Sequence, residues 1–420
     1  MTPRERIKAA LNHKQPDRVP VDFGATAVTG VSVSVISKLR KTFGLDKPGD
    51  RVKVSEPFQM LGEIGSDLRA KMFIDTVGLF NINNMFGFPN TGWKPWRTFD
   101  GTDILVPEKF NTEPDKNGNI PMWAEGDKNY PPSVIMPKDG FYFDAIIRQE
   151  PIDDNNLNPK DNADDYGIYS DELLRYLEKE SKRLYTETDN ALVYSMGGAS
   201  LGDIALVPGL WVKDPKGIRD IEEWYVSTVT RRDYVYKVFE LQTETAMKNL
   251  ACVKDALGDR IEVIFLSGTD FGTQRGPFIS PVAYRDLYKP FHKKFNDWVH
   301  KNTKWKTLIH SCGGIRPLLS DIIDAGFDIL NPVQCSADGM EAQKLKDDFG
   351  DKLVFWGGGV DTQKTLPFGT PEQVYQQVSE RIRIFNKGGG FVFDTIHNVQ
   401  ALTPVENMTA MLDAIKDSFK

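Results

Sequence analysis

A repeated alternation of short apolar segments with helical patterns constrains the fold of this chain more than any other feature. From about residue 160 onward, each apolar segment is followed by a stretch in which apolar residues recur every three or four positions. Continuous apolar segments are typical of strands in a parallel sheet that is covered on both faces. Six such strands are predicted, at Ala191–Met196, Glu262–Leu266, Thr307–Ile309, Phe327–Leu330, Leu353–Trp356 and Gly390–Phe393.

Two further strands are predicted earlier in the chain, at Arg18–Gly24 and Phe73–Phe80. Eight strand–helix units that close on themselves form a (βα)8 barrel. The rival fold, a doubly wound open sheet, lacks support because the chain has neither G-x-G-x-x-G after an early strand nor G-x-x-x-x-G-K-[ST]. We therefore predict an α/β fold, a single (βα)8 TIM barrel domain over residues 1–420.

Residues 81–144 break the strand–helix pattern, between the second and third predicted strands. This segment is rich in Gly, Pro, Asn and Trp and contains short alternating runs such as Asp103–Val106. No Ser/Gly linker isolates it, so we expect a β-rich insertion of hairpins and loops within the barrel domain. Its aromatic residues either pack the insertion onto the barrel or cover an apolar or aromatic substrate; they are Trp93, Trp96, Trp123, Tyr130, Phe141, Tyr142 and Phe143.

Charge and cysteine content exclude several classes of function. The formal net charge of −7 and the pI of about 5.5 argue against a basic face for nucleic acid or anionic lipid. No apolar run reaches the roughly 18 residues of a membrane span, and the first residues do not resemble a signal peptide. Three cysteines are too few for a disulfide scaffold, so we expect a cytoplasmic protein whose thiols are free for metal or thiol chemistry.

Polar and titratable residues directly follow most of the predicted strands, and glycines lie beside them. In a (βα)8 barrel these positions meet at one face, where catalysis takes place. We therefore expect a deep pocket at that face. The residues predicted to line it are Tyr194, Asp270, Gln274, His310, Cys312, Asn331, Gln334, Trp356, Asp394 and His397.

The most specific local pattern is His310-Ser311-Cys312, after the fifth strand. Residues two apart on an extended chain point to the same face, and imidazole and thiolate are both good zinc ligands. His397 follows the eighth strand, so barrel closure would bring it toward the pair and complete a three-ligand site with one open position. Cys335 competes as the third ligand. The alternative is a structural one, in which Cys312 is a small buried apolar residue and His310 a hydrogen-bonded core histidine.

A second motif, Gly198-Ala199-Ser200-Leu201-Gly202, matches the G-x-S-x-G pattern of α/β-hydrolases. With Asp361 and His397 it even follows the hydrolase order of catalytic residues. Such a match is common in a glycine-rich chain, and the strand count favours a barrel. We interpret the segment as a glycine-lined loop that leaves room for a substrate.

Several of these motifs together resemble the uroporphyrinogen decarboxylase superfamily. They are Pro16-Asp17-Arg18-Val19-Pro20-Val21, His310-Ser311-Cys312-Gly313-Gly314, Asn331-Pro332-Val333-Gln334 and His397-Asn398, with Thr403-Pro404 and Glu406-Asn407 following. The resemblance implies a (βα)8 barrel and one of two chemistries. Decarboxylases of this superfamily bind substrate carboxylates through an arginine-bearing segment after the first strand, and the matching residues here, 22–30, contain no arginine.

The second branch of the superfamily comprises corrinoid-dependent methyltransferases, which carry zinc through a His-x-Cys on the fifth strand. His310 and Cys312 match that pair, and His397 stands where better-known members have a cysteine. The resemblance implies methyl transfer between a small methylated substrate, of methoxylated aromatic or methylamine type, and a corrinoid. No D-x-H-x-x-G stretch is present, so the corrinoid is expected on a separate protein. A homodimer is a further expectation.

The mechanism that the resemblance implies is a displacement at a methyl carbon, with zinc as Lewis acid. Asp270 and Asp394 are the candidates for a general acid or for orienting the substrate, although either could instead cap a helix. Substrate contacts are expected from Tyr194, Gln274, Asn331, Gln334 and Trp356. The alternatives are a uroporphyrinogen decarboxylase-like lyase and a barrel that binds without catalysing, because a fold does not fix a function.

Overall fold

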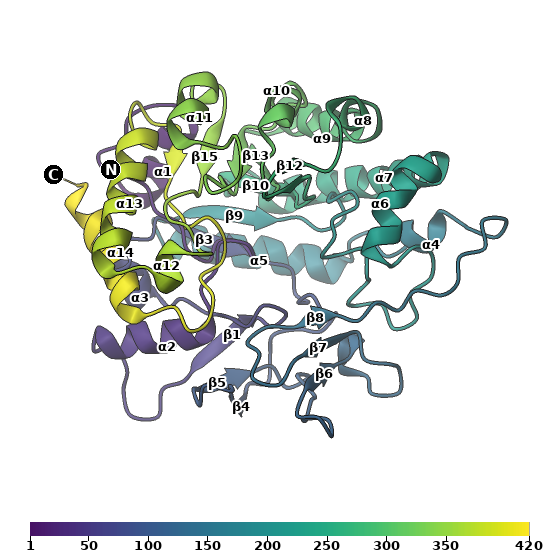
Figure 1. Ribbon diagram of the computed structural model, residues 1–420, viewed down its shortest axis with the longest axis horizontal. Coiled ribbons are helices and arrows are strands. Elements are labelled where there is room, and N and C mark those ends of the chain that lie inside the picture. The colour runs from purple at the N-terminus through teal and green to yellow at the C-terminus, as the bar shows by residue number, and fades with distance from the viewer. Residues whose placement is uncertain (420) are drawn as a thin grey trace.

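The structure is a computed structural model that describes residues 1–419, and it confirms the predicted α/β barrel architecture (Figure 1). Seven parallel strands form one sheet in the order β16-β15-β14-β13-β10-β9-β3, so each strand pairs with the next one along the chain that belongs to the sheet. The strands are β3 (Thr76–Leu79), β9 (Ala191–Ser195), β10 (Val263–Ser267), β13 (Lys306–His310), β14 (Ile329–Asn331), β15 (Val354–Trp356) and β16 (Phe391–Val392).

The predicted first strand, Arg18–Gly24, is reduced to a bridge that closes the barrel between β16 and β3. Val21 pairs in parallel with Phe393, and the Asp22 N–H donates to the Phe393 carbonyl at 2.8 Å. On the other side, the Asp75 N–H donates to the Val21 carbonyl at 2.8 Å. The Val21 N–H donates to the Asp75 carboxylate at 3.0 Å instead of to a backbone carbonyl, which interrupts a regular ladder here.

Helices cover the outside of the strands, as Figure 1 shows for the upper part of the molecule. The helices after α1 (Pro3–Leu11) are α2 (Val33–Thr42), α3 (Ser66–Lys71), α4 (Lys160–Ala163), α5 (Asp171–Glu187), α6 (Ile221–Thr230), α7 (Arg232–Leu257), α8 (Pro281–Leu287), α9 (Lys289–Asn302), α10 (Leu319–Asp324), α11 (Ala342–Phe349), α12 (Thr365–Phe368), α13 (Pro371–Phe385) and α14 (Val405–Asp417), with 3-10 turns η1 (Ala124–Gly126) and η2 (Arg316–Leu318). None of these helices, which lie within residues 1–419, is long and apolar enough to cross a bilayer.

Helix α1 belongs to the core inside the barrel. It begins with a capping box in which the Thr2 hydroxyl accepts the Glu5 N–H and the Glu5 carboxylate accepts the Thr2 N–H. Its residues Ile7 and Leu11 pack in one buried cluster with inward side chains of the strands, such as Val193. The helix therefore fills the end of the barrel opposite to the one where the strands end.

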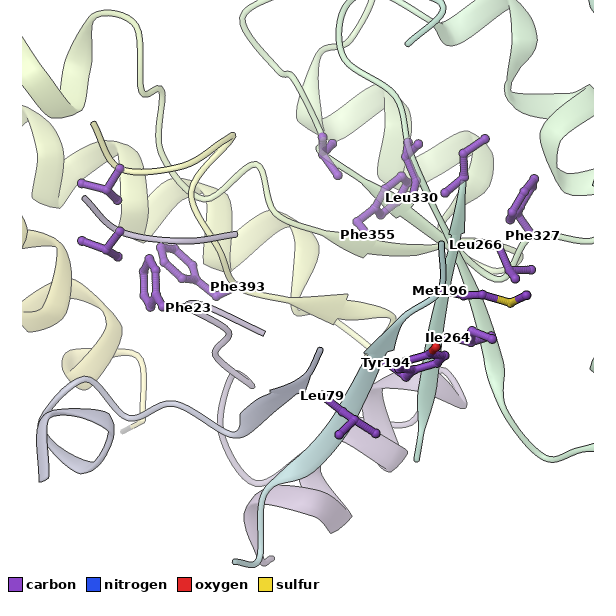
Figure 2. Packing of buried hydrophobic residues seen from close by; sticks show 14 of the residues in the cluster. Phe23, Leu79, Tyr194, Met196, Ile264, Leu266, Phe327, Leu330, Phe355 and Phe393 are labelled. Carbon is purple, nitrogen blue, oxygen red and sulfur yellow. The ribbon is translucent and has the colours of Figure 1, made fainter. Parts of the chain in front are cut away.

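Alternate strand residues face outward and pack under the helices (Figure 2), as the period of two along a strand requires. Tyr194 and Leu266 belong to this outer layer, and the rings of Phe23 and Phe393 meet there at 6.3 Å between centroids. This division of each strand decides which side chains can reach the barrel interior and the face above it.

The predicted β-rich segment contributes strands to two small sheets, which lie beneath the barrel in Figure 1. One has the order β2-β1-β5-β4 and the other the order β6-β7-β8. Their strands are β1 (Val52–Glu56), β2 (Leu61–Gly62), β4 (Lys94–Arg97), β5 (Asp103–Val106), β6 (Ile120–Met122), β7 (Val134–Met136) and β8 (Asp144–Ala145). The sequence analysis missed β1 and β2, which precede β3 in the chain. A short hairpin of β11 (Gly272–Thr273) and β12 (Gly276–Pro277) follows β10.

Candidate metal centre and cavity

Three potential metal ligands meet at the end of the barrel where the strands end. His310 is the last residue of β13, Cys312 lies two residues further on, and His397 follows β16. One ligand atom from each lies within 4.8 Å of the others, and His310 Nε2 is 3.4 Å from Cys312 Sγ. Zinc bonds of about 2.0–2.3 Å place ligand atoms some 3.3–3.8 Å apart in a tetrahedron, so small side-chain movements would suffice for all three to share one ion.

Asn331 holds the imidazole of His310 in place. His310 Nδ1 lies 2.6 Å from Asn331 Oδ1, and Asn331 Nδ2 donates to the Trp356 carbonyl at 3.0 Å. Since the amide oxygen can only accept, the proton of the imidazole lies on Nδ1. The lone pair is then on Nε2, which points toward Cys312. An outer hydrogen bond of this kind commonly fixes a metal-binding histidine.

Asp270, in the loop after β10, fixes the position of Cys312. Its Oδ1 accepts the Cys312 N–H at 2.6 Å and lies 4.0 Å from His310 Nε2. The carboxyl group is therefore next to the cluster without being one of its three members.

Burial keeps both imidazoles of the cluster neutral, as coordination of a metal cation requires. It lowers the pKa of both His310 and His397 to about 4, so both imidazoles are neutral and able to coordinate near pH 7. Burial, followed by the charge of Asp270, raises the pKa of the Cys312 thiol. A bound metal would offset this cost, because its charge stabilises a thiolate. Two neutral imidazoles and a thiol form a donor set that fits zinc.

A cavity of about 1200 Å³ opens beside the cluster. Asp270, His310 and His397 belong to its wall. The rest of the wall comes mainly from the insertion, from the loop after β9 and from the segment before α5. These residues include Glu56, Phe58, Gln59, Asn81, Phe141, Tyr142, Phe143, Tyr166, Tyr169, Gly197, Ser200, Asp203 and Trp211.

Three residues that the sequence suggested for substrate contacts lie elsewhere. Tyr194 faces outward on β9 because its neighbours Val193 and Ser195 face inward, and its hydroxyl donates to Asn81 at 3.0 Å. Gln274 lies exposed in the β11–β12 hairpin and donates to Gln363. Gln334 accepts the Gly313 N–H at 2.6 Å and so shapes the loop after Cys312.

Asp394 and Trp356 lie inside the barrel rather than in the cavity wall. Trp356 Nε1 donates to Asp22 at 2.9 Å, and both Asp22 and Asp394 are fully buried. Burial, together with the charge of Asp22, raises the pKa of Asp394 far above its ordinary value. This position gives Asp394 no direct path to a substrate in the cavity, which argues against the general-acid role suggested by the sequence.

The structure also shows where Cys335 and the G-x-S-x-G segment lie. Cys335 packs against the outer core, where burial raises the pKa of its thiol to about 11, and it is not part of the three-residue cluster. Ser200 Oγ accepts the Gly268 N–H at 2.8 Å, which makes it a link between two loops. Ser200 of the segment and Gly197 just before it line the cavity, in line with the interpretation as a loop that borders a substrate.

Sequence reasoning missed most of the cavity wall. Tyr166 and Asp203 lie in loops, where no periodic pattern indicates which side chains point inward, and Glu56 ends β1, a strand that the sequence analysis missed. Only Asp203 had a usable signal, because it directly follows the Gly198–Gly202 segment that was expected to border the substrate.

The chain is similar to several known proteins. Residues 217–418 match the family model of uroporphyrinogen decarboxylase (URO-D). A methylated-thiol–coenzyme M methyltransferase of Methanosarcina mazei is 29% identical over 140 residues, which cover 33% of this chain and 34% of that protein. The methylcobamide:CoM methyltransferase MtaA of Methanosarcina barkeri is 22% identical over 218 residues, or 50% of this chain and 58% of that protein. The chain thus covers less than two thirds of either relative.

A solved structure of a methyltransferase from Methanosarcina mazei superimposes over the whole length of both chains with a TM-score of 0.57. At 16% identity this likeness shows the fold alone. The fold is thus shared with that methyltransferase, and residues 217–418 resemble uroporphyrinogen decarboxylases. The sequence matches confirm the expected resemblance to the methyltransferase branch of that superfamily.

Proposed function

We propose that this protein is a zinc-dependent methyltransferase that moves a methyl group between a small methylated substrate and a corrinoid carried by a separate protein. The observation that carries the proposal is the joint position of His310, Cys312 and His397 on the edge of the large cavity. Three protein ligands that leave a coordination position open are the arrangement of catalytic zinc sites, whereas structural zinc sites are closed by four.

His310, Cys312 and His397 would hold the zinc, which supplies a Lewis acid for the heteroatom that carries or receives the methyl group. Asn331 keeps Nε2 of His310 directed at the site, and Asp270 fixes the backbone of Cys312. Asp270 also lies in the cavity wall, where its carboxyl can orient the substrate by a hydrogen bond. In the direction toward the corrinoid, transfer would break the bond between the methyl carbon and its heteroatom and form a bond from that carbon to cobalt. The heteroatom would leave with the bonding electron pair, and the wall residues align the breaking bond for displacement.

The size of the cavity supports a reaction with a corrinoid partner. Its volume of about 1200 Å³ exceeds the range of about 300–1,000 Å³ that is common for small-molecule sites. The names of both curated relatives specify methyl transfer with coenzyme M, and one of them also names a methylcobamide. Aromatic residues of the insertion, Phe141, Tyr142 and Phe143, line the cavity and favour transfer from a methylated donor to the corrinoid.

A uroporphyrinogen decarboxylase-like lyase is the second candidate, because the matching family model carries that name. The substrate of such an enzyme bears several carboxylates. The segment 22–30 contains no arginine, and within residues 1–419 no lysine or arginine lines the cavity. Binding of a polyanion would leave its charges without partners, which disfavours this candidate.

The test is metal analysis of the purified protein together with a methyl-transfer assay. Free reduced cobalamin serves as acceptor, and methoxylated aromatics and methylamines serve as donors. We expect about one zinc per chain and formation of methylcobalamin with at least one donor. A metal-free protein would contradict the proposal. So would a zinc-loaded protein that fails to methylate cobalamin with every one of these donors. Formation of coproporphyrinogen from uroporphyrinogen would favour the lyase.

A further inference from the structure

The charged groups in the cavity wall all have the same sign. Within the part of the chain that the structure describes, the wall contains no lysine or arginine. It contains the five carboxyl groups of Glu56, Asp144, Asp165, Asp203 and Asp270. A site for an anionic substrate would need cationic or other donor groups at the substrate's charge, so this composition selects against carboxylates, sulfonates and phosphates.

Not all five carboxyl groups are available to a ligand. Asp165 forms an ion pair with Arg219, whose side chain is only 1% exposed and which also donates to the Val207 carbonyl. Asp144 is exposed in β8. The two oxygens of Glu56 accept the Phe58 and Gln59 N–H groups at 2.9 and 2.7 Å. The carboxyl groups that remain for a ligand inside the cavity are those of Asp203 and Asp270.

Asp203 lies beside Asp270 across Gly268. A Cβ atom on Gly268 would come within 2.5 Å of Asp203 Oδ2, so that carboxyl oxygen packs directly on the glycine backbone. Asp203 Oδ1 accepts the Ala205 N–H at 2.9 Å. Burial and the charge of Asp270 raise the pKa of Asp203 to about 8. No lysine or arginine of the described cavity wall offsets this cost.

Two aromatic side chains of the cavity wall pack on each other beside Asp165, and one of them, Tyr166, lies near Asp203. Tyr166 and Trp211 both belong to the cavity wall, and their ring centroids lie 5.5 Å apart with an angle of 57° between the planes. Burial, and after it the charges of Asp165 and Asp203, raise the pKa of the Tyr166 hydroxyl. Trp211 Nε1 donates to the Asp165 carbonyl, which connects the rings to the Arg219 ion pair. Aromatic faces next to a carboxylate are a known means of binding ammonium groups.

We propose that the substrate is a methylated compound that also bears an ammonium group, and that Asp203, Tyr166 and Trp211 bind this group. The inference rests on the proposed methyl transfer. A zinc ion with one thiolate would carry a net charge of +1, which Asp270 would balance. A bound ammonium group would supply the positive charge that Asp203 lacks and would favour the ionised form of Asp203. A methylated amine or a methoxylated aromatic amine meets this requirement, whereas a methoxybenzoate or a thiol sulfonate does not.

The test uses three compounds that share one methoxy group and differ in one charge. They are 4-methoxybenzylamine as cation, 4-methoxybenzyl alcohol as neutral compound and 4-methoxybenzoate as anion. Calorimetry on the zinc-loaded protein at pH 7.5 gives the affinity of each. We expect the amine to bind at least about tenfold more tightly than the alcohol, and the benzoate more weakly than either. An alcohol or benzoate that binds as tightly as the amine would overturn the inference.

Two variants locate the preference. Asp203→Asn preserves the shape of the side chain and should reduce the preference for the amine over the alcohol to less than about threefold. Asp255→Asn removes the same charge from an 80% exposed position on α7 and should leave the preference intact. A preference that survives Asp203→Asn in folded protein would show that another group selects the cation and would contradict the assignment to Asp203.

Methyl transfer to reduced cobalamin is measured separately with the same compounds. Tighter binding of the amine without transfer from any compound would contradict the methyltransferase and leave the cation site in place. Transfer with equal rates and affinities for amine and alcohol would support the methyltransferase and contradict the cation site.

Discussion

The two sides of the cavity are built in different ways. The metal side consists of His310, Cys312 and His397, which lie at the ends of barrel strands or within a few residues of them. The substrate side, represented by Tyr166 and Asp203, comes from loops that are long and irregular. The metal side is thus positioned by the closed sheet itself, whereas the substrate side depends on how loops and insertion pack on one another. A rigid half that holds the reactive ion and a variable half that selects the substrate would allow one barrel to act on many compounds.

The largest effect that this comparison predicts is loss of the metal from its rigid side. Cys312→Ser removes a thiolate ligand and should release zinc and reduce methyl transfer by at least about a thousandfold. The fold should persist because the cluster lies above a complete core. Cys335→Ser is the matched control and should retain the metal. Full zinc retention in Cys312→Ser, measured by metal analysis, would remove Cys312 from the site.

The rigidity of the metal side can be tested at Gly358, which follows β15 and has φ of +80°. A Cβ atom there would lie 2.8 Å from the Val333 carbonyl oxygen and 2.9 Å from Val333 Cβ. Gly358→Ala should therefore lower the free energy of unfolding by about 3 kcal/mol. Gly101→Ala has a similar φ of +78° but nothing within 4 Å, and should cost only about 1 kcal/mol. Equal losses in denaturant titrations would contradict the tight packing described around Gly358.

The sequence predicted the barrel and the metal side because both depend on periodic patterns. Continuous apolar runs located the strands, and His310 and Cys312 could be placed because the end of a strand fixes which side chains share a face. The same reasoning fails when the predicted position along a strand is wrong by one residue, because successive side chains face opposite sides. Tyr194 was expected in the cavity but faces outward for this reason. Asp203 and Tyr166 could not be predicted, since loop conformation is decided by tertiary contacts such as those of Arg219.

A smaller effect is expected when the support of the metal side is removed without removing a ligand. Asn331→Ala deletes the acceptor that fixes His310 Nδ1. We expect zinc affinity to fall about 10- to 100-fold in a chelator competition, while circular dichroism stays unchanged. Asn331→Asp restores an acceptor and should recover part of the affinity, which a merely structural role of Asn331 would not predict.

On the substrate side, the raised pKa of Asp203 should make the free energy of unfolding depend on pH. The pKa of Asp203 in the folded protein, about 8, lies above that of an unfolded aspartate, so folding favours the protonated form. Stability is therefore lost as the pH rises from about 4 to about 8. Asp203→Asn should be more stable than the wild type by about 1 kcal/mol or more at pH 8 and by little at pH 4. A difference that does not change between these two pH values would refute the raised pKa.

The smallest effect is expected at the rim of the substrate side. Tyr142 belongs to the insertion, is 49% exposed and lines the cavity. Tyr142→Ala should raise KM about two- to fivefold, with kcat and zinc content unchanged, because only contacts shared by the ground state and the transition state are lost. A change in zinc content instead would mean that the two sides are not independent.

The central claim, that His310, Cys312 and His397 together bind one zinc, is tested most directly by X-ray absorption at the zinc edge. For the wild-type protein we predict one sulfur at about 2.3 Å and two imidazole nitrogens at about 2.0–2.1 Å, with one further oxygen from water. A first shell with two or more sulfurs would indicate that Cys335, and not His397, is the third zinc ligand. A shell without sulfur would contradict the account of the site as a whole.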